Sequence, residues 1–410
     1  MLPSGWKLTT LGKVCEGELQ TGPFGSQLHA YEYQEAGVPV LMPKDIINCR
    51  ADIYNAAKIS KQRADDLRKH RLLAGDLLLS RRGDVARFAL IDERTEGSIC
   101  GTGCLKARPS KNHSPIFLSY ILQKNTVKTW LEQNAVGQTM PNMNTAILTE
   151  LPLISASSRE EEDKIAQILS TWDKAIEKLE ALIAAKQKCK KALMQQLLTG
   201  KMRFPGFNGK WKEVTLGDVF SKISNGLTYD TNAPDGLPVT RIETTSTGKV
   251  NYEKVGWAPD EDNTKRFALQ YGDILYSHIN SLEHIGRVAF HRAEKPLYHG
   301  MNLLLLRPNK KVVPELIFHI LNSSIGKKYA KNYAKSAVNQ ASISTTDIKS
   351  FKVSIPEIDE QQKIASVLCS ADNEITIHQN QLAALKKQKK GLMQQLLTGK
   401  KRVQINQVAA

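Results

Sequence analysis

The residue types that most often carry out catalysis do not occur in this sequence at the spacing of any common active site. The sequence contains no phosphate-binding glycine loop, no Gly-x-Gly-x-x-Gly fingerprint, no Gly-x-Ser-x-Gly nucleophile turn and no His-Glu-x-x-His zinc motif. It also lacks the Asn-Pro-Pro-aromatic tetrapeptide with which an amino-methyltransferase would hold its target base. We therefore expect a chain that recognises a partner and has no catalytic residue of its own.

Cys100, Cys104 and His113 come closest to a metal site. They could supply three ligands to zinc, but a closed structural site needs four, and this spacing fits no common zinc module. Glu162-Asp163-Lys164 matches half of a nuclease metal motif, yet no Pro-Asp pair precedes it at a workable distance. Since the six cysteines also form no disulfide framework, we expect buried free thiols, no metal ion and a reducing compartment.

The charge balance points to a polyanionic partner. Lysine and arginine number 57 against 41 acidic residues, which gives a net charge of +16 and favours nucleic acid over an anionic membrane surface. No apolar run approaches the roughly 18 residues that a membrane span requires. The amino terminus lacks both the basic start and the apolar stretch of a secretion signal. We expect a cytoplasmic protein that has no membrane partner.

The elements that must position any binding residues form a long internal repeat. Residues 161–201 align without a gap on residues 360–400, and 21 of these 41 positions are identical. The match is strongest at its end, where Gln-Gln-Leu-Leu-Thr-Gly-Lys closes both segments. Looser matches, such as Gly75-Asp76 with Gly272-Asp273, extend the repeat over the rest of each half. The chain is therefore a tandem duplication.

The two similar segments are predicted to be long amphipathic helices. Apolar residues recur at spacings of three and four, and Gly200 and Gly399 stand where each helix should stop. A helix of about 40 residues is about 60 Å long and needs a partner to cover its apolar face, and the other copy is the obvious partner. Acidic residues dominate positions 160–180 and only basic residues carry charge in 186–203, which favours antiparallel pairing. Two unrelated helices with solvated charged faces remain the alternative.

The rest of each half is predicted to be compact and mixed in structure. Short β-rich runs such as Val38–Met42 and Gly272–Tyr276 are separated by turn residues, and a shorter helix should follow Pro115 and Pro314. The predicted fold class is α+β, with two mixed globular domains in a pseudo-twofold repeat, separated by two long antiparallel helices that form a coiled coil. The predicted boundaries are a first globular domain at 1–158, a first helix at 159–203, a second globular domain at 204–357, a second helix at 358–400 and a tail at 401–410.

This layout resembles the specificity subunit of type I restriction-modification systems, and the resemblance covers essentially the whole chain. It rests on Trp-Lys-x-x-Thr-Leu-Gly, which starts at Trp6 and again at Trp211, and on Gly-Asp-x-Leu in the middle of each domain. It rests also on Gln362-Lys363-Ile364-Ala365 at the start of the second helix and on the two closing Gln-Gln-Leu-Leu-Thr-Gly-Lys segments. The first helix departs from this pattern with Asp163-Lys164-Ile165-Ala166 and lacks the usual Pro-Pro before it, which should alter the local entry geometry only.

The resemblance implies that each globular region is a target recognition domain that reads one half of an asymmetric bipartite site in double-stranded DNA. The helices would set the distance between the half-sites and dock two methyltransferase subunits, which bind S-adenosylmethionine and methylate adenine. Restriction subunits that use ATP and Mg would translocate and cleave unmodified DNA, as in phage defence. This chain itself would bind no cofactor and would catalyse nothing.

Base reading is then expected from polar side chains in loops where the backbone can approach a DNA groove. The candidates in the first domain are Ser26, Gln27, Lys44, Arg81, Arg82, Gln138, Asn142 and Asn144. The candidates in the second domain are Asn225, Thr228, Arg241, His278, Asn280, Asn339, Gln340 and Ser342. For each of them, a solvated loop side chain is the alternative.

Two other functions are compatible with part of the pattern. A nuclease or methyltransferase that shares this layout would need a catalytic block, and two domains with two long helices leave no room for one in 410 residues. A coiled-coil assembly scaffold without a DNA role would bind protein only, with little dependence on salt, whereas a DNA-reading protein should lose affinity steeply as salt rises.

Overall fold

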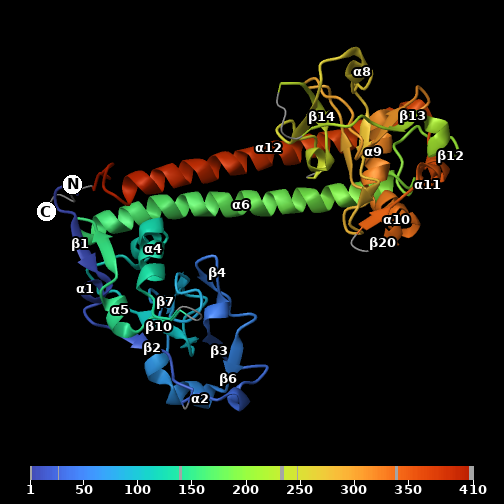
Figure 1. Cartoon of the computed structure of the whole chain (residues 1–410). Coiled ribbons are helices and arrows are strands. Elements are labelled where there is room, and N and C mark those ends of the chain that lie inside the picture. Colours follow the sequence, from blue (N-terminus) through green and yellow to red (C-terminus); the bar gives the residue numbers. More distant parts are fainter. Residues whose placement is uncertain are drawn as a thin grey trace. The chain divides into compact units, whose positions relative to one another are not determined.

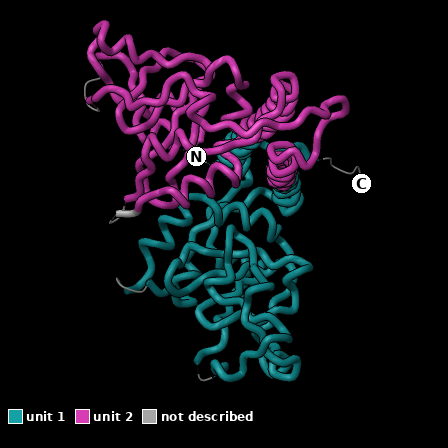
Figure 2. Tube along the Cα trace, turned by 90° about the vertical axis from the view of Figure 1, so that its right-hand side faces the viewer, with its two compact units in different colours: residues 1–178, 382–410 teal, residues 179–381 magenta. Residues whose placement is uncertain are grey.

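The structure is a computed structural model that describes residues 2–25, 27–137, 141–230, 235–246, 248–337 and 340–405. The chain divides into two compact units, which Figure 2 shows in different colours. The first unit comprises residues 1–178 and 382–410, and the second unit comprises residues 179–381. Each unit therefore contains one globular region together with a part of both long helices.

The globular region of the first unit is built from short strands and helices. Its strands are β1 (Lys7–Thr10), β2 (Leu19–Thr21), β3 (Val38–Leu41), β4 (Ile46–Ile47), β5 (Arg50–Ala51), β6 (Ala57–Ile59), β7 (Leu77–Ser80), β8 (Phe88–Leu90), β9 (Ile99–Cys100), β10 (Cys104–Ala107) and β11 (Pro152–Ser155). Its α-helices are α1 (Leu11–Val14), α2 (Lys61–Asp66), α3 (Pro115–Leu122), α4 (Asn125–Asn134) and α5 (Thr145–Thr149), and its 3-10 helices are η1 (Ala30–Glu32), η2 (Pro43–Asp45) and η3 (Arg68–His70). The long helix α6 (Arg159–Leu197) follows.

The globular region of the second unit repeats this mixture. Its strands are β12 (Lys212–Thr215), β13 (Phe220–Asn225), β14 (Leu237–Thr240), β15 (Val255–Ala258), β16 (Ile274–Tyr276), β17 (Ile279–Asn280), β18 (Val288–Phe290), β19 (Leu304–Pro308), β20 (Lys335–Ala337), β21 (Gln340–Ser342) and β22 (Lys352–Ile355). Its helices are α7 (Leu216–Val219), η4 (Ile242–Thr245), α8 (Asp262–Lys265), α9 (Pro314–Asn322), α10 (Ser324–Tyr333) and α11 (Thr345–Ser350). The long helix α12 (Ile358–Leu396) follows.

The two units have the same main sheet topology. An antiparallel four-stranded sheet in the order β2-β10-β7-β8 in the first unit corresponds to the order β13-β19-β16-β18 in the second. In each unit a two-stranded sheet, β1-β11 or β12-β22, pairs the first strand of the globular region with its last. The predicted α+β class and the predicted short helices after the two prolines, α3 and α9, are confirmed.

Both predicted long helices are present, and each has 39 residues (Figure 1). Gly200 and Gly399 follow them with φ of 68° and 67°, the left-handed conformation that glycine adopts easily and that ends a helix. Among the described residues, no helix is both long enough and apolar enough to span a bilayer. The helices begin at residues 159 and 358, and they end at Leu197 and Leu396, before the predicted ends at 203 and 400.

The long helices pair antiparallel inside each unit. In the first unit, Asp173 of α6 accepts from Lys389 of α12 at 2.5 Å, and Glu161 near the start of α6 pairs with Arg402 beyond the end of α12 at 2.6 Å. The second unit repeats both contacts with the helices exchanged. There Asp372 pairs with Lys190 at 2.5 Å, and Glu360 pairs with Arg203 at 2.7 Å. The predicted match of acidic helix starts with basic helix ends is confirmed.

In each unit, one hydrophobic cluster joins the globular region to the ends of both helices. In the first unit, Trp6 and Leu169 of α6 belong to the same buried cluster as Leu396 of α12. In the second unit, Leu197 of α6 and Leu368 of α12 belong to one cluster. The globular regions are thus held to the helix pair by burial of apolar surface, the dominant favourable term in folding.

A buried carboxylate braces the four-stranded sheet of each unit. Asp76, 1% exposed, accepts two hydrogen bonds from the Arg108 guanidinium at 2.7 and 2.8 Å. Asp273, also 1% exposed, accepts the same pair from Arg307 at 2.8 and 2.7 Å. This forked geometry fixes the turn before β7 or β16 against the neighbouring strand.

Candidate nucleic-acid interface

Eight of the sixteen polar residues selected from the sequence gather at two places, one in each unit. The first polar cluster lies beyond the end of β7 in the first unit, and the second lies beyond the end of β16 in the second unit. Ser26, Gln138 and Asn339 lie outside the described residues. The first polar cluster consists of Lys44, Arg81, Arg82 and Asn142, and the second polar cluster consists of His278, Asn280, Gln340 and Ser342.

Backbone hydrogen bonds bring the first polar cluster together from three parts of the chain. Arg81 N–H donates to Gly103 O at 2.9 Å, and Met143 N–H donates to Arg81 O at 2.8 Å. The next residue, Arg82, forms an isolated antiparallel bridge with Asn142. Pro43 of η2 and the Arg82 side chain both lie within 4 Å of a Cβ built at Gly103. The turn that carries Lys44 therefore lies beside Arg82.

Two buried polar atoms in the first polar cluster have no hydrogen-bond partner among the described residues. Arg81 is 9% exposed, and its Nε is one of these atoms; Asn142 Oδ1 is the other. Burial and the neighbouring Arg82 lower the pKa of the Arg81 guanidinium. Because buried donors and acceptors are nearly always satisfied in native proteins, these atoms mark a place where water or a ligand supplies the missing hydrogen bonds.

The second polar cluster is built on a small sheet with the order β17-β21-β20. Ile343 N–H donates to His278 O at 2.9 Å. The strand pairing sets Asn280 opposite the buried Ala341, so Asn280 shares a face with Ala341, whereas the exposed Gln340 and Ser342 point to the opposite face. The Asn280 side chain donates to Ser277 Oγ at 3.0 Å, which fixes its orientation. His278 is 7% exposed, its Nδ1 has no partner among the described residues, and burial lowers its pKa.

The two clusters occupy the same place in the topology but present different chemistry. The first presents two guanidinium groups and an ammonium group, which are donors only, beside the single amide of Asn142, which can also accept. The second presents the Gln340 amide and the Ser342 hydroxyl on its exposed face and the Asn280 amide on the other face, and all three groups can both donate and accept. Since a guanidinium pairs best with guanine and an amide with adenine in the major groove, the clusters are suited to different base patterns.

Of the remaining candidates, some make hydrogen bonds to nearby residues of the chain and others are exposed. Gln27 Oε1 accepts from Phe24 N–H at 3.0 Å, and Asn144 Oδ1 caps α5 by accepting from Ile147 N–H at 2.8 Å. Arg241 donates to Glu243 at 2.6 Å, a hydrogen bond that raises the pKa of Arg241. Asn225 and Thr228 are exposed at the end of β13 and in the loop that follows.

Some exposed features of the first unit were not found from the sequence. The rings of His29 and Tyr31 stack with centroids 5.3 Å apart, and Tyr31 is 83% exposed. A separate hollow is lined by Lys69, Arg71 and Lys106, and the Lys106 ammonium donates to Lys69 O at 2.8 Å. No pattern in the sequence shows which aromatic residue will be exposed. Nor does any pattern show which basic residues will come together in space when the chain folds.

The residues considered for a metal are occupied otherwise. Cys100 and Cys104 are both fully buried, and burial raises the pKa of Cys100 to about 12 and that of Cys104 well above its ordinary value. His113 Nδ1 lies 3.1 Å from Glu162 Oε1 instead. The prediction of buried free thiols is confirmed for Cys100 and Cys104. Within the described part of the chain, no group of three histidine, cysteine or carboxylate side chains is placed to hold a metal ion.

Comparisons with known proteins agree with this duplicated layout. A family model described as "Type I restriction modification DNA specificity domain" matches residues 3–187 and again residues 208–387. A putative type I restriction enzyme MjaX specificity subunit of Methanocaldococcus jannaschii is 44% identical over 193 residues, which cover 46% of this chain and only 45% of that protein. The EcoKI specificity subunit of Escherichia coli is 22% identical over 384 residues, which cover 88% of this chain and 81% of that protein.

The fold also matches a solved structure. The type I restriction-modification S subunit from M. genitalium superimposes with a TM-score of 0.63 over 98% of this chain and 97% of that one, at 17% sequence identity. At this identity the match concerns the fold alone. It shows that two mixed globular regions with two long helices are an arrangement that other chains adopt.

Proposed function

The chain belongs to the family defined by the type I restriction-modification DNA specificity domain, and we propose on that premise that it reads DNA sequence for a type I restriction-modification complex. The observation that carries the proposal is the repeated placement of a polar cluster at one position of a repeated topology, with different side chains in each copy. One scaffold that presents two different sets of donors and acceptors is what recognition of two different half-sites requires.

In the proposed mechanism, each polar cluster faces base edges while nearby lysine and arginine side chains contact phosphates. Arg82 is exposed and its guanidinium can form the two parallel hydrogen bonds that guanine offers. The exposed Gln340 can do the same with adenine. The phosphate contacts would position the protein without reading sequence.

We further propose that the paired helices set the distance between the half-sites and dock two methyltransferase subunits. A helix of 39 residues is about 58 Å long at 1.5 Å per residue. The methyltransferase subunits would bind S-adenosylmethionine and methylate adenine, and restriction subunits would use ATP and Mg to cleave unmodified DNA in the cytoplasm. This chain would bind none of these cofactors and would take no part in the chemical steps.

Salt-dependent DNA binding tests the DNA role directly. The chain, assembled with its two methyltransferase subunits, should bind duplex DNA with an affinity that falls steeply between low and moderate salt, because phosphate contacts release counterions. The comparison between a duplex that carries the target site and one that does not separates base reading from phosphate contact. Protein binding without any salt-dependent DNA binding would instead identify a scaffold.

Domain replacement tests the division of labour between the units. Residues 1–158 are replaced by the corresponding region of a relative with a different target, and methylated adenines are then mapped in genomic DNA. One half-site should change while the other stays the same. A change in both half-sites would contradict independent reading by the two globular regions.

Helix lengthening tests the proposed spacing. Seven residues are inserted into each long helix at matched points, after Ala181 and after Asn380, so that the apolar faces stay in register. The number of unread base pairs between the half-sites should increase. A chain with a single insertion serves as control, since it would disturb the helix pairing, and an unchanged spacing in the double insertion would show that the helices do not set it.

A further inference from the structure

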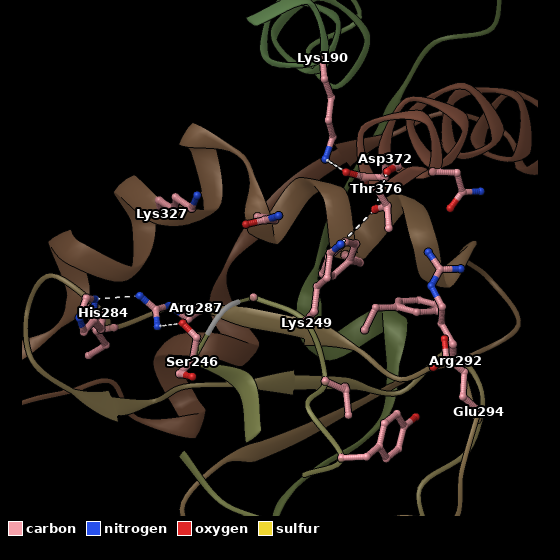
Figure 3. A pocket seen from close by; sticks show the side chains of 18 of the residues that line it. Lys190, Ser246, Lys249, His284, Arg287, Arg292, Glu294, Lys327, Asp372 and Thr376 are labelled. Carbon is pink, nitrogen blue, oxygen red and sulfur yellow. Dashed lines mark hydrogen bonds and ion pairs between the residues drawn. The ribbon is translucent and has the colours of Figure 1, made fainter. Parts of the chain in front are cut away.

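A cavity of about 810 Å³ lies in the second unit where the globular region meets the helix pair (Figure 3). Its wall comes from the loop after η4, the turn before β18, the helices α9 and α10, and one face of α6 and α12. This volume lies within the range of sites that hold small ligands. None of the residues assigned to DNA reading lines this cavity.

Positive charge predominates in this cavity. Six cationic side chains line it against three carboxylates. Only one ion pair joins members of the two groups among the described residues, Lys190 with Asp372 at 2.5 Å. The cations are Lys190, Lys249, Arg287, Arg292, Lys327 and Lys331, and the carboxylates are Glu283, Glu294 and Asp372.

Two of the unpaired cations are held in place by neutral groups. Arg287 donates to Ser246 O through Nη1, and its Nη2 lies 2.9 Å from His284 Nδ1. The Lys249 ammonium donates to Thr376 Oγ1 of α12 at 3.0 Å, and Figure 3 shows its side chain reaching toward the helix. Neutral partners orient these side chains but leave their charge uncompensated. Both therefore keep positive charge in a fixed position beside the cavity.

The cations are close enough to affect one another. The pKa of Lys327 is lowered, first because packing removes water from part of its side chain and then because Lys190, Arg287 and Lys191 lie near it. Like charges that face one concavity repel each other and raise its positive potential, which attracts a counter-ion. Bound anionic oxygen atoms would remove this repulsion.

The first unit has an equivalent cavity in which the charges are closer to balance. This cavity, of about 600 Å³, is lined by four cations and three carboxylates. Lys389 pairs with Asp173 at 2.5 Å, and Arg50 pairs with Glu177. Glu177 occupies the position in α6 that Thr376 occupies in α12. The missing carboxylate at Thr376 is one reason why the second cavity carries uncompensated charge.

We propose that the cavity of the second unit is a binding site for a phosphate-bearing ligand, with Lys249, Arg287 and Lys331 as its principal contacts. A planar guanidinium pairs with two phosphate oxygens at once, and the lysines add point charges around them. The phosphate could belong to a free oligophosphate or to the backbone of a bound duplex, and both present the same tetrahedral anion. The proposal does not rest on base reading by the polar clusters.

Binding of tripolyphosphate to the full chain tests the site without DNA. Isothermal titration at low salt compares the natural chain with the doubly substituted chain Lys249→Gln/Lys331→Gln, in which both altered residues are exposed and should not disturb folding. The substituted chain should bind about tenfold more weakly or worse, because two charge-assisted contacts are lost. Lys174→Gln, in the equivalent cavity of the first unit, is the matched control and should leave the affinity unchanged.

A second arm distinguishes the two sources of phosphate. The same chains, assembled with the methyltransferase subunits, are titrated with duplexes that carry or lack the target site. If tripolyphosphate fails to bind but the double substitution weakens both duplexes equally and reduces the salt dependence, the ligand is the DNA backbone. If the double substitution changes neither tripolyphosphate nor duplex binding, the proposal is wrong. Arg287→Lys, which keeps the charge and removes the fork, should give an intermediate loss.

Discussion

The contact between globular region and helix pair is the clearest difference between the two units. In the first unit the contact is ionic, since Arg50 pairs with Glu177 and the Tyr120 hydroxyl donates to Asp173 at 2.5 Å. In the second unit, Lys249 donates to the neutral Thr376 at 3.0 Å. A buried His319, with Nε2 3.7 Å from Cys369 Sγ, takes the position of Tyr120. The same scaffold therefore joins its globular regions to the helices in two chemically different ways.

The interactions that build the scaffold itself are repeated without change. One buried carboxylate–arginine fork and two ion pairs that join the long helices or the residues just beyond them occur in each unit at equivalent positions. The two copies therefore share the ion pairs that hold each unit together and differ in the side chains that each unit exposes. Four experiments break or sharpen this comparison.

The largest expected effect of a single substitution comes from breaking a repeated fork. Arg108→Met leaves the buried carboxylate of Asp76 without its charged partner, and Arg307→Met does the same to Asp273. Each substitution should lower the free energy of unfolding of its own unit by about 3 kcal/mol, because an unpaired buried charge is costly. Hydrogen exchange read peptide by peptide, with the other unit as internal control, measures the effect.

The comparison requires the two substitutions to have similar effects. A difference of more than about 1 kcal/mol between Arg108→Met and Arg307→Met, well beyond the usual error of additivity for distant sites, would show that the two scaffolds are not equivalent. Asp76→Asn combined with Arg108→Met should recover part of the loss, since it removes the buried charge itself.

Acid should affect the second unit more than the first. Four of the five buried histidines among the described residues belong to the second unit. Burial lowers the pKa of two of them, His299 and His319, to about 4. A histidine buried in its neutral form contributes stability that is complete above its unfolded pKa of about 6.5 and is lost as the pH falls toward 4. Protonation of His299 and of His319 should each lower the free energy of unfolding of the second unit by about 2 to 3 kcal/mol between pH 6.5 and pH 4.

Hydrogen exchange at pH values between 7 and 4 measures this difference. Exchange in the second unit should accelerate first, and His319→Gln, which cannot be protonated, should shift the change to lower pH. His29→Gln, at an exposed position in the first unit, serves as control. If both units lost protection at the same pH, burial of the histidines would not control acid stability.

Replacing the glycine that ends each long helix by alanine should destabilise the two helix ends to different extents. Both glycines adopt positive φ, which costs about 1 kcal/mol for alanine. A Cβ at Gly399 would also lie 2.5 Å from Pro3 Cγ, whereas at Gly200 its nearest neighbour is Trp211 at 3.5 Å. Gly399→Ala should therefore destabilise by about 2 kcal/mol and Gly200→Ala by about 1. Thermal unfolding measures both, and equal losses would contradict the closer packing at Gly399.

The smallest effect on stability is expected from exchanging the residues at positions 177 and 376, which join each globular region to its long helix. Thr376→Glu should give Lys249 an ionic partner, and Glu177→Thr should remove the partner of Arg50. Because both pairs are exposed, each change should alter the free energy of unfolding by less than about 1 kcal/mol. Thr376→Glu should nevertheless weaken tripolyphosphate binding severalfold, since it adds a negative charge to the cavity. An unchanged affinity for tripolyphosphate would show that the charge at position 376 does not affect binding in the cavity.

The sequence alone determined the helical framework. The three-and-four spacing of apolar residues, the closing glycines and the separation of acidic from basic charge are all local patterns, and each depends only on the geometry of one helix. The duplication then supplied the partner helix, because two copies of one amphipathic helix can cover each other. The direction of pairing followed from Coulomb attraction between acidic and basic ends.

The tertiary structure alone decided which loop residues act together. Arg82 meets Asn142 and Asn280 pairs with Ala341 across about 60 residues of chain, and a sequence carries no local signal for contacts made by closing such long loops. The same holds for the charged cavity, whose cations come from α6, from the loop after η4, from the two sides of β18 and from α10. Helices are encoded by neighbours in sequence, whereas a binding surface is encoded by neighbours in space.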